Sequence, residues 1–495
     1  MDFQNNIASL QFFIPELIIA GTILLVVIAD LILKKRHSYR TAYYAFAGLA
    51  ATFIAVMLTS TIPRGLFFET IAIDPFAIFF KVIILVATLF TIGISLQTKE
   101  LERYRFGEYY GLVLTMVLGM FLLVSAIDLL MIYLALEIVS ITSYILAGFL
   151  KHRQRSNEAA LKYVIYGGVS SGIMLFGFSI LFGLTGSTNI AEVHQALLAS
   201  GGNTLTLTVT ILLVLAGFGY KIASVPFHFW SPDVYEGAPT PITGFLSVAP
   251  KAAGFAVIIR FFNVTLVGNT TPNMTEWFVL SNLPWPDILA AISAMTMFLG
   301  NLVAIKQDNV KRMLAYSSIA HAGYLLMGMV VLTQQGLFAI MYYLVVYLFM
   351  NLGAFLIVII IANQYDTETI DEYRGLGFKI PYIGIIMAVF MFALTGLPPT
   401  AGFVGKFYLF SALIEAGKEF YWLAMVGIIN SVISFYYYAR VVKVMFFEDA
   451  PESLETHSPH TWMTTLATLL VIPTLLLGIY WESIAEFTLN SLQFF

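Results

Sequence analysis

Residues 205–226 read LTLTVTILLVLAGFGYKIASVP, an apolar run that contains one lysine, Lys221, and ends at Pro226. A stretch of about 20 predominantly apolar residues can cross a lipid bilayer as a helix. The chain of 495 residues contains fourteen such stretches, so the sequence predicts an all-α polytopic membrane protein with about 14 transmembrane helices. The segments are 13–33, 42–61, 72–96, 107–126, 128–150, 160–186, 205–226, 240–263, 284–305, 311–332, 336–363, 381–411, 420–446 and 462–481.

The composition supports lipid as the main solvent. Apolar residues make up 59% of the chain and charged residues 11%, whereas an ordinary soluble domain has about 25% charged residues. The net charge of −4 gives no reason to expect a nucleic-acid partner. Cysteine is absent, which excludes iron–sulfur clusters and thiolate metal sites. We therefore expect the chain to bind no cofactor or metal ion of its own.

Basic residues are unevenly distributed between the connections. Those after the first, third, fifth, ninth, eleventh and thirteenth segments hold eighteen of the 25 lysines and arginines. Cytoplasmic loops are enriched in these residues, so we expect these connections to face the cytoplasm and both termini to face the other side. The eighteen are Lys34, Lys35, Arg36, Arg40, Lys99, Arg103, Arg105, Lys151, Arg153, Arg155, Lys162, Lys306, Lys311, Arg312, Arg374, Lys379, Arg440 and Lys443.

Four ionisable residues lie deep within apolar segments: Glu137, Lys221, Lys251 and Lys406. A charge at the bilayer centre costs about 2.5–3.5 kcal/mol on insertion scales, so each should face the protein interior. Burial lowers the pKa of a lysine and raises that of a glutamate, which moves both toward neutrality, whereas an arginine stays charged. The set favours a proton relay over the alternative, a group of static ion pairs that hold helices together.

Other ionisable residues are further candidates. His321, inside the tenth segment, can shuttle protons, although a structural histidine fits equally well. His228 follows the break in the seventh segment, and Lys81 lies seven residues after Asp74, where a shallow position is expected. Asp128 stands at a helix start, where a cap or a surface charge is the simpler interpretation. We keep His228, Lys81 and Asp128 as possible secondary sites.

All three deep lysines lie near prolines, and Pro250, directly before Lys251, is expected to kink the eighth segment. Pro226 follows Lys221 by five residues, and Pro399 precedes Lys406 by seven. A proline frees a carbonyl in the preceding turn, and such a group is tolerated at membrane depth only inside protein or beside water. The seventh and twelfth segments are therefore predicted to be broken helices. Because they lie five segments apart, we predict two inverted five-helix repeats, segments 4–8 and 9–13.

The predicted domain organisation follows from these repeats. Residues 1–106 hold the first three helices, 107–263 the first repeat, 284–446 the second repeat and 447–495 the last helix. No connection is long enough for a separate soluble domain.

Several motifs resemble one family. The run SVPFHFWSPDVYEGAPTP at 224–241 is similar to the connection between the seventh and eighth helices in antiporter-like membrane subunits of respiratory complex I. The continuation FLSVAPKAAG at 245–254 is similar to the subunit N branch in particular. So are SNEAALKY at 156–163, KRMLAYSS at 311–318 and GLPPTAGFVGK at 396–406. Subunit M carries a glutamate in the twelfth helix where this chain has Lys406, which also favours the N branch.

The resemblance implies roles for the matching residues. Glu137 would pair with Lys221 and tune its proton affinity, Lys251 would be the central link, and His321 would bridge Lys251 to Lys406, the terminal donor or acceptor. The complex would reduce quinone with NADH or a related donor, while this chain, a translocase subunit without a redox centre, carries protons. Expected partners are subunit M, small membrane subunits and lipid, in a bacterial inner membrane or an equivalent membrane.

Two other functions stay open. A multisubunit sodium/proton antiporter contains chains that resemble the same family and share the glutamate and the lysines. A non-pumping scaffold that seals and braces the membrane arm is the second alternative.

Overall fold

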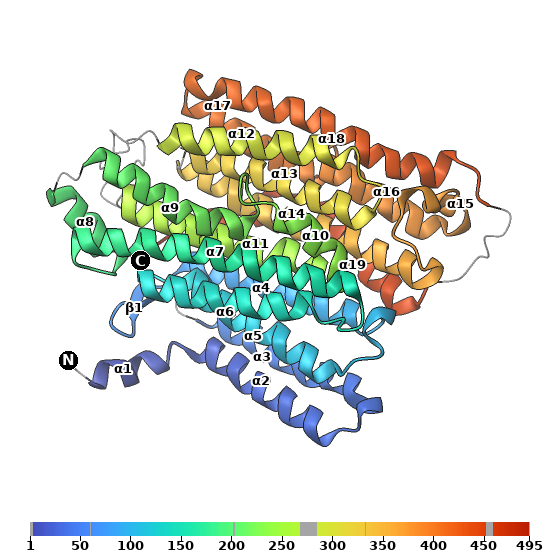
Figure 1. Ribbon diagram of the computed structural model, residues 1–495, viewed down its shortest axis with the longest axis horizontal. Helices are drawn as coiled ribbons and strands as arrows, with labels where there is room; N and C mark the ends of the chain where they lie inside the picture. Colours follow the sequence, from blue (N-terminus) through green and yellow to red (C-terminus); the bar gives the residue numbers. More distant parts are fainter. Residues whose placement is uncertain are drawn as a thin grey trace.

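The computed structural model describes residues 3–59, 61–200, 203–267, 285–331, 333–451 and 459–494. Most of these residues are helical, and the long helices run side by side (Figure 1). The only strands in the described ranges form one antiparallel hairpin of β1 (Arg64–Leu66) and β2 (Ile71–Ile73).

The fourteen predicted segments are found as helices, which confirms the fold class. Twelve helices of the described ranges are long and apolar enough to cross a membrane, and α16 and α19 are shorter apolar helices. The helices that match the segments are α2 (Ile14–Ile32), α3 (Thr41–Met57), α4 (Pro75–Ser95), α5 (Phe106–Ser125), α6 (Leu129–Ala147), α7 (Gln154–Thr185), α9 (Thr204–Ile222), α11 (Thr240–Phe262), α12 (Trp285–Ala304), α13 (Val310–Val331), α14 (Gln334–Tyr365), α16 (Pro381–Thr395) with α17 (Ala401–Ala416), α18 (Tyr421–Phe447) and α19 (Thr461–Leu476).

Shorter elements lie at the ends of these helices or between them. The short α-helices are α1 (Phe3–Leu10), α8 (Ile190–Ser200), α10 (Trp230–Gly237), α15 (Leu376–Lys379) and α20 (Glu482–Asn490). The 3₁₀ and π turns are η1 (Lys35–Arg40), η2 (Lys99–Leu101), η3 (Asn263–Val267), η4 (Ile370–Tyr373) and η5 (Lys418–Phe420).

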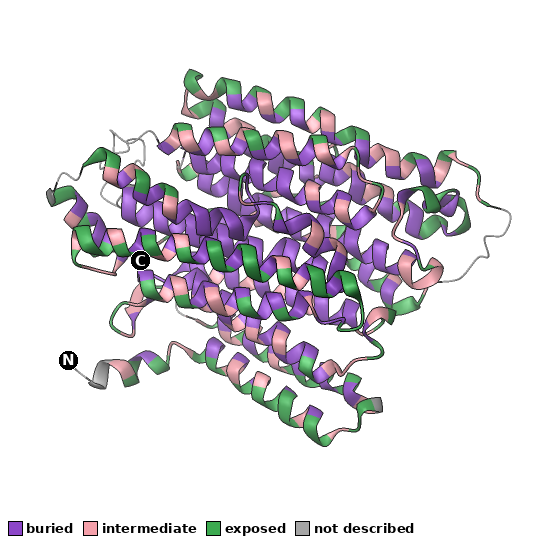
Figure 2. Cartoon of the chain, in the orientation of Figure 1, coloured by how far each residue is buried: buried purple, intermediate pink, exposed green. Residues whose placement is uncertain are grey.

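The centre of the bundle is buried and its outer helices are not (Figure 2). Every residue of α11 is buried. By contrast, α2 and α18 expose large apolar side chains, for example Leu24 at 64% and Val432 at 69%. Apolar side chains that face outward over whole helices are the surface that a bilayer covers. The chain is therefore an integral membrane protein.

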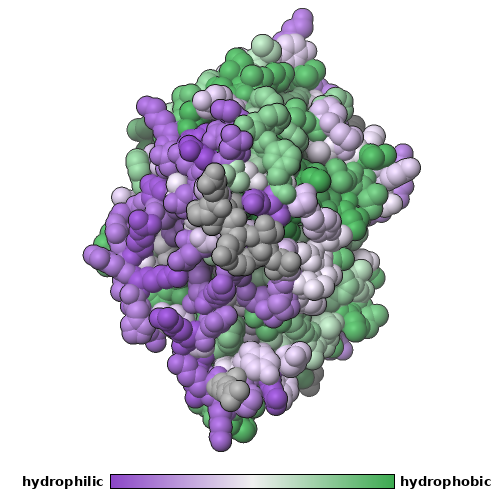
Figure 3. Space-filling model, turned by 90° about the vertical axis from the view of Figure 1, so that its right-hand side faces the viewer, coloured by the Kyte–Doolittle hydropathy of each residue, from purple (hydrophilic) through white to green (hydrophobic). Residues whose placement is uncertain are grey.

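The two ends of the bundle differ in character. Figure 3 views the end that carries α15, where hydrophilic residues cover much of the surface and hydrophobic ones lie toward its edges. The basic connections after odd-numbered segments lie at this end, and the side chains of Arg153 and Arg155 are 55% and 75% exposed there. Both termini lie toward the opposite end, as does the β-hairpin (Figure 1).

Both predicted helix breaks are present. The helix α9 ends before Ala223, which has a left-handed φ of 58°, and residues 224–229 lead into α10. The helix α16 ends before Gly396, which has a φ of 89° that glycine adopts without a steric cost, and α17 follows from Ala401. Pro250 does not interrupt α11.

Each break falls in the fourth membrane helix of a five-helix set. The first set is α5, α6, α7, α9 and α11, and the second is α12, α13, α14, α16–α17 and α18. An odd number of crossings makes equivalent helices run in opposite directions. The domain boundaries 1–106, 107–263, 284–446 and 447–495 stay a prediction, and residues 268–284 lie outside the described ranges.

A fully buried ion pair joins the first repeat to the N-terminal helices. The Arg260 guanidinium on α11 donates to both carboxylate oxygens of Asp74 at 2.6 and 2.9 Å, and both side chains are 0% exposed. Arg260 also donates to the Val124 carbonyl and lies over the rings of Phe76 and Phe494. Arg260, near the end of the eighth predicted segment, is therefore a central packing contact of the bundle.

Loss of this arginine should destabilise the fold strongly. In the Arg260→Leu variant Asp74 loses its guanidinium, and breaking one side of a buried pair costs about 3–5 kcal/mol. We expect a clear fall in thermal unfolding temperature. The Arg260→Leu, Asp74→Asn double variant should regain part of the loss because no buried charge is then left. An Arg260→Leu variant as stable as the parent would contradict a stabilising role for the pair.

Candidate functional site: a chain of buried amines

The five predicted relay residues lie on five different helices. The side chains of Lys221, Lys251, His321 and Lys406 are almost wholly buried, with exposed fractions of 4%, 2%, 2% and 3%. Glu137 is half-buried. Their helices are α6 for Glu137, α9 for Lys221, α11 for Lys251, α13 for His321 and α17 for Lys406.

Glu137 and Lys221 interact through space. The charge of Glu137 acts on Lys221, but no ion pair within 4.0 Å joins the two described side chains. Lys221 instead donates to the Ser140 hydroxyl at 3.3 Å, about one helical turn beyond Glu137. The Glu137 Oε1 atom is buried without a hydrogen-bond partner. The pair that the resemblance implies is therefore held apart in this conformation.

Lys251 is bound by one residue of the neighbouring repeat. Its Nζ atom donates to the Ser318 carbonyl at 2.5 Å and to the Ser318 hydroxyl at 2.6 Å. Ser318 belongs to α13, the second helix of the second repeat, whereas Lys251 belongs to α11 in the first. This contact crosses from one repeat to the other.

His321 is held by a tyrosine at each ring nitrogen. Tyr343 on α14 lies 2.7 Å from Nδ1, and Tyr438 on α18 lies 3.2 Å from Nε2. The Tyr438 hydroxyl also bonds to the hydroxyl of Ser317. The imidazole therefore lies between two hydroxyl groups that can each donate or accept a proton.

Lys406 is solvated by the broken helix. Its Nζ atom donates to the Thr395 carbonyl at 2.8 Å, at the end of α16, and to the Ser431 hydroxyl at 3.3 Å. The ammonium also lies 4.4 Å from the centre of the Tyr324 ring, within cation–π range. The last carbonyls of a helix are unpaired and carry partial negative charge, so the break supplies the ligand that the amine needs.

The three deep lysines share one electrostatic feature. Over the described ranges, none of Lys221, Lys251 and Lys406 has a carboxylate oxygen within 4.0 Å of its amine. Their hydrogen-bond partners are hydroxyls and carbonyls. Static ion pairs are therefore absent at these three positions, and each amine contacts one serine hydroxyl, a group that can pass a proton on.

The connecting hydroxyl groups were not found from the sequence. Sequence reasoning identified the amines and the imidazole but missed the side chains that join them. The available signal was the pair Ser317–Ser318, one helical turn before His321 on the same helix. The missed residues are Ser140, Ser317, Ser318, Tyr324, Tyr343, Ser431 and Tyr438.

The three secondary candidates form no hydrogen bond or ion pair with the relay residues in the described ranges. Lys81, near the start of α4, forms a buried ion pair of 2.6 Å with Glu16 on α2, a partner that the sequence did not reveal. Asp128 caps α6 by accepting from the Leu130 and Met131 amides, which confirms the cap interpretation. His228 is 4% exposed in the break after α9, and its Nδ1 atom has no hydrogen-bond partner.

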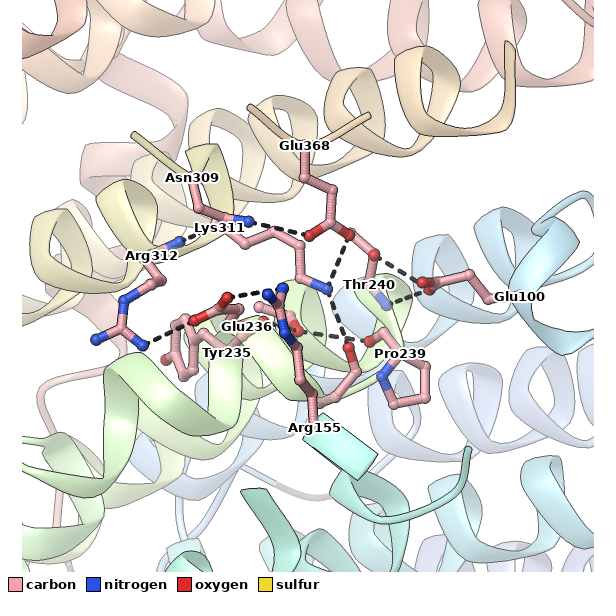
Figure 4. A network of polar contacts seen from close by, with 12 residues as sticks. Glu100, Arg155, Tyr235, Glu236, Pro239, Thr240, Asn309, Lys311, Arg312 and Glu368 are labelled. Atoms are coloured by element: carbon pink, nitrogen blue, oxygen red, sulfur yellow. Dashed lines mark hydrogen bonds and ion pairs between the residues drawn. The ribbon is translucent and has the colours of Figure 1, made fainter. Parts of the chain in front are cut away.

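A network of charged and polar side chains lies at the hydrophilic end of the bundle (Figure 4). Arg312 on α13 donates to Glu236 at 2.8 Å and to Asp233 at 2.6 Å, and both acids belong to α10. Lys311, next to it, donates to Glu368 and to the Ala238 carbonyl, both at 3.2 Å. A cavity of about 980 Å³ is lined by residues of this network, including Lys311, and opens at this end.

Two carboxyl groups at this end, those of Asp233 and Glu100, are held in the charged form. Burial alone raises the pKa of Asp233, but hydrogen bonds from Lys162 and Arg312 outweigh it and hold the pKa below its usual value. Burial likewise raises the pKa of Glu100, but the charge of Lys311 and a hydrogen bond from the Thr240 amide lower it by more. The ion pairs therefore persist throughout the neutral range.

This shift predicts a pH-dependent contribution to stability. The Asp233→Asn variant should lose about 1 kcal/mol at pH 7, since partly exposed ion pairs contribute little each. A lowered pKa makes the contribution complete above the ordinary aspartate value of about 3.9 and removes it as pH falls through the lower folded value. Thermal unfolding of both proteins from pH 7 to pH 3 should show a difference that shrinks only below about pH 4. A difference that instead vanished between pH 7 and pH 5 would contradict the lowered pKa.

The described residues include no cluster of three or more histidine, aspartate or glutamate side chains that could hold a metal ion. The buried polar groups are instead arranged as single amines with single hydroxyl or carbonyl partners. This donor set suits proton exchange.

The bundle and its centre define a class of protein. Two five-helix sets, each with one broken helix, surround buried lysines in an antiporter-like membrane subunit. A family model described as "NADH:quinone oxidoreductase/Mrp antiporter, TM" matches residues 126–434. The chain belongs to this family.

Curated relatives are similar over nearly the whole chain. "NADH-quinone oxidoreductase subunit N 2" of Chloroherpeton thalassium is 46% identical over 488 residues, which cover 97% of this chain and 94% of the relative. "NADH-quinone oxidoreductase subunit N" of an Anaeromyxobacter species is 45% identical over 510 residues, covering 99% and 98%.

Solved structures are similar as well. A chain of respiratory complex I from Thermus thermophilus with bound aureothin has a TM-score of 0.78 at 31% identity, covering 95% of this chain and 98% of that one. A chain of the Mrp complex from a Dietzia species has a TM-score of 0.81 at 20% identity, covering 97% of each chain, a likeness that shows the fold alone.

Proposed function

We propose that the chain is a proton-carrying subunit in the membrane arm of an NADH:quinone oxidoreductase. One observation carries the proposal: three buried amines, none paired with a carboxylate within 4.0 Å in the described ranges, lie among hydroxyl and carbonyl groups on adjacent helices. Structural lysines at membrane depth need a counter-charge, as Lys81 has in Glu16. Amines without one are suited to gaining and losing a proton.

The proposed driving force is electrostatic. Two unit charges attract each other by about 4 kcal/mol at 4 Å and about 2 kcal/mol at 8 Å when the effective dielectric constant is about 20. Moving one charge against 100 mV costs about 2.3 kcal/mol. Closing and opening the Glu137–Lys221 pair is thus of the right size to release a proton toward Lys251 and then Lys406. Quinone reduction in other subunits would supply the energy.

The proposed orientation follows from the charges. The hydrophilic end in Figure 3 would face the cytoplasm, and both termini would face the other side of a bacterial inner membrane or an equivalent membrane. The expected partners are an antiporter-like subunit M and small membrane subunits. NADH and quinone would bind to other chains of the complex.

A sodium/proton antiporter subunit is the second candidate, because the fold is shared with the Mrp complex at a TM-score of 0.81. Purification of the tagged chain from its native membrane separates the two. If the chain is a subunit of complex I, hydrophilic redox subunits and NADH:quinone reductase activity should purify with the tagged chain. Purification with other membrane chains only, without that activity, would contradict the first proposal and support the antiporter.

A further inference from the structure

The two tyrosines that hold His321 form part of a continuous hydrogen-bonded row. The order is Ser317, Tyr438, His321 and Tyr343, and each bonds to the next through a side-chain atom. The residues come from α13, α18 and α14, and each is buried. A row of hydroxyl and imidazole groups without a gap is a path along which protons can hop.

Both ends of the row lie beside an amine of the relay. Ser317 is next to Ser318, which binds the Lys251 ammonium through its hydroxyl and its carbonyl. At the other end, the Tyr343 ring packs on Gly405, so closely that an added Cβ there would lie 2.4 Å from a ring carbon. Gly405 directly precedes Lys406 in α17. The row therefore lies between a neighbour of the residue that binds Lys251 and a neighbour of Lys406 itself.

The protonation of the His321 imidazole determines which tyrosine donates a hydrogen bond to it and which accepts one. A neutral histidine has one ring nitrogen that donates and one that accepts, and the partner at each nitrogen selects which is which. Tyrosine hydroxyls donate and accept at once. When Tyr438 donates to Nε2, Nδ1 carries the hydrogen and donates to Tyr343.

We propose that Tyr438 and Tyr343 position His321 and carry the proton between Lys251 and Lys406. This inference rests on the proposed function. A proton arriving at Ser317 Oγ displaces the serine hydrogen to Tyr438, whose own hydrogen passes to Nε2. The Nδ1 hydrogen then leaves to Tyr343, whose own hydroxyl hydrogen passes on toward the neutral Lys406 amine. One O–H or N–H bond forms for each that breaks, one proton enters and one leaves, and His321 ends as the other neutral tautomer.

The chain offers a matched control beside Tyr343. Tyr342 is the preceding residue on α14, is equally buried, and donates its hydroxyl to the Leu477 carbonyl at 3.2 Å, away from the row. Tyr343→Phe and Tyr342→Phe each remove one buried hydroxyl from the same helix. Only the first interrupts the row.

The test uses the assembled complex in proteoliposomes. Tyr438→Phe and Tyr343→Phe should each slow proton translocation about tenfold, a modest value for loss of a positioned proton carrier, while Tyr342→Phe leaves it near that of the parent. Nitrogen-15 resonances of His321 should shift from the Nδ1–H to the Nε2–H tautomer in Tyr438→Phe only, a change that a purely structural role would not produce. Tyr343→Phe serves as the second variant if Tyr438→Phe fails to assemble.

The outcomes separate this inference from the broader function. Suppose that Tyr438→Phe and Tyr343→Phe translocate protons normally while Lys251→Met does not. This result would overturn the row as a proton path and leave the proposed relay through the lysines standing. Equal losses in Tyr343→Phe and Tyr342→Phe, with an unchanged tautomer in Tyr438→Phe, would also overturn the row. Normal translocation in Lys251→Met would overturn the relay itself.

Discussion

Replacement of Lys251 by methionine should lower proton translocation by the assembled complex at least tenfold. Lys251 is 2% exposed and is the amine that contacts both repeats. Methionine has a similar length but no proton to exchange, and loss of a positioned acid or base typically costs 10²–10⁴-fold in rate. Proton uptake into proteoliposomes, normalised to the amount of assembled complex, measures the effect.

Lys251→Arg is the matched control for charge. Arginine keeps a positive charge at the Ser318 contact but does not release its proton in the working pH range. We expect a complex that assembles and stays inactive in translocation. A Lys251→Arg complex that pumps normally would mean that this position supplies charge and not protons. Normal pumping by Lys251→Met with intact assembly would support the scaffold function.

Replacement of Glu137 by glutamine should separate function from stability. The Glu137 Oε1 atom is buried without a hydrogen-bond partner, so removal of its charge should leave the unfolding temperature unchanged or raise it. The same change removes the counter-charge that acts on Lys221, and we expect translocation to fall about tenfold. Thermal unfolding and proton uptake are measured on the same preparation.

Glu137→Asp is the control for this carboxylate, since it keeps the charge on a shorter side chain. It should retain more translocation than Glu137→Gln. If glutamine lowered stability by several kcal/mol and translocation only in proportion to the loss of folded complex, Glu137 would be structural. That outcome would remove the electrostatic driving step.

The membrane architecture could be predicted from the sequence because its causes are local. Each crossing needs only a run of about 20 apolar residues, and each break needs a proline in such a run. The deep lysines were visible for the same reason, since a charge in an apolar run stands out. The matches at α9 and at α16–α17 follow from these two signals.

The partners of these charges could not be predicted, because they come from distant parts of the chain. Asp74 and Arg260 are 186 residues apart, and Glu16 and Lys81 are 65 apart. Tyr438 is 117 residues from His321 and resembles any other membrane tyrosine in sequence. Helix packing decides whether a carboxylate lies beside a buried amine. A lysine with such a carboxylate forms an ion pair, and a lysine without one is a candidate for the proposed relay.

The most direct test asks whether the buried amines change their protonation state during turnover. Infrared difference spectra of the complex, with lysine labelled by nitrogen-15, would compare the resting state with the state formed on addition of NADH and quinone. If protons pass through the amines, ammonium bands should shift with the label and weaken in Lys251→Met and in Lys406→Met. Spectra without any lysine band would show that the amines keep one charge throughout, and would contradict proton transfer through them.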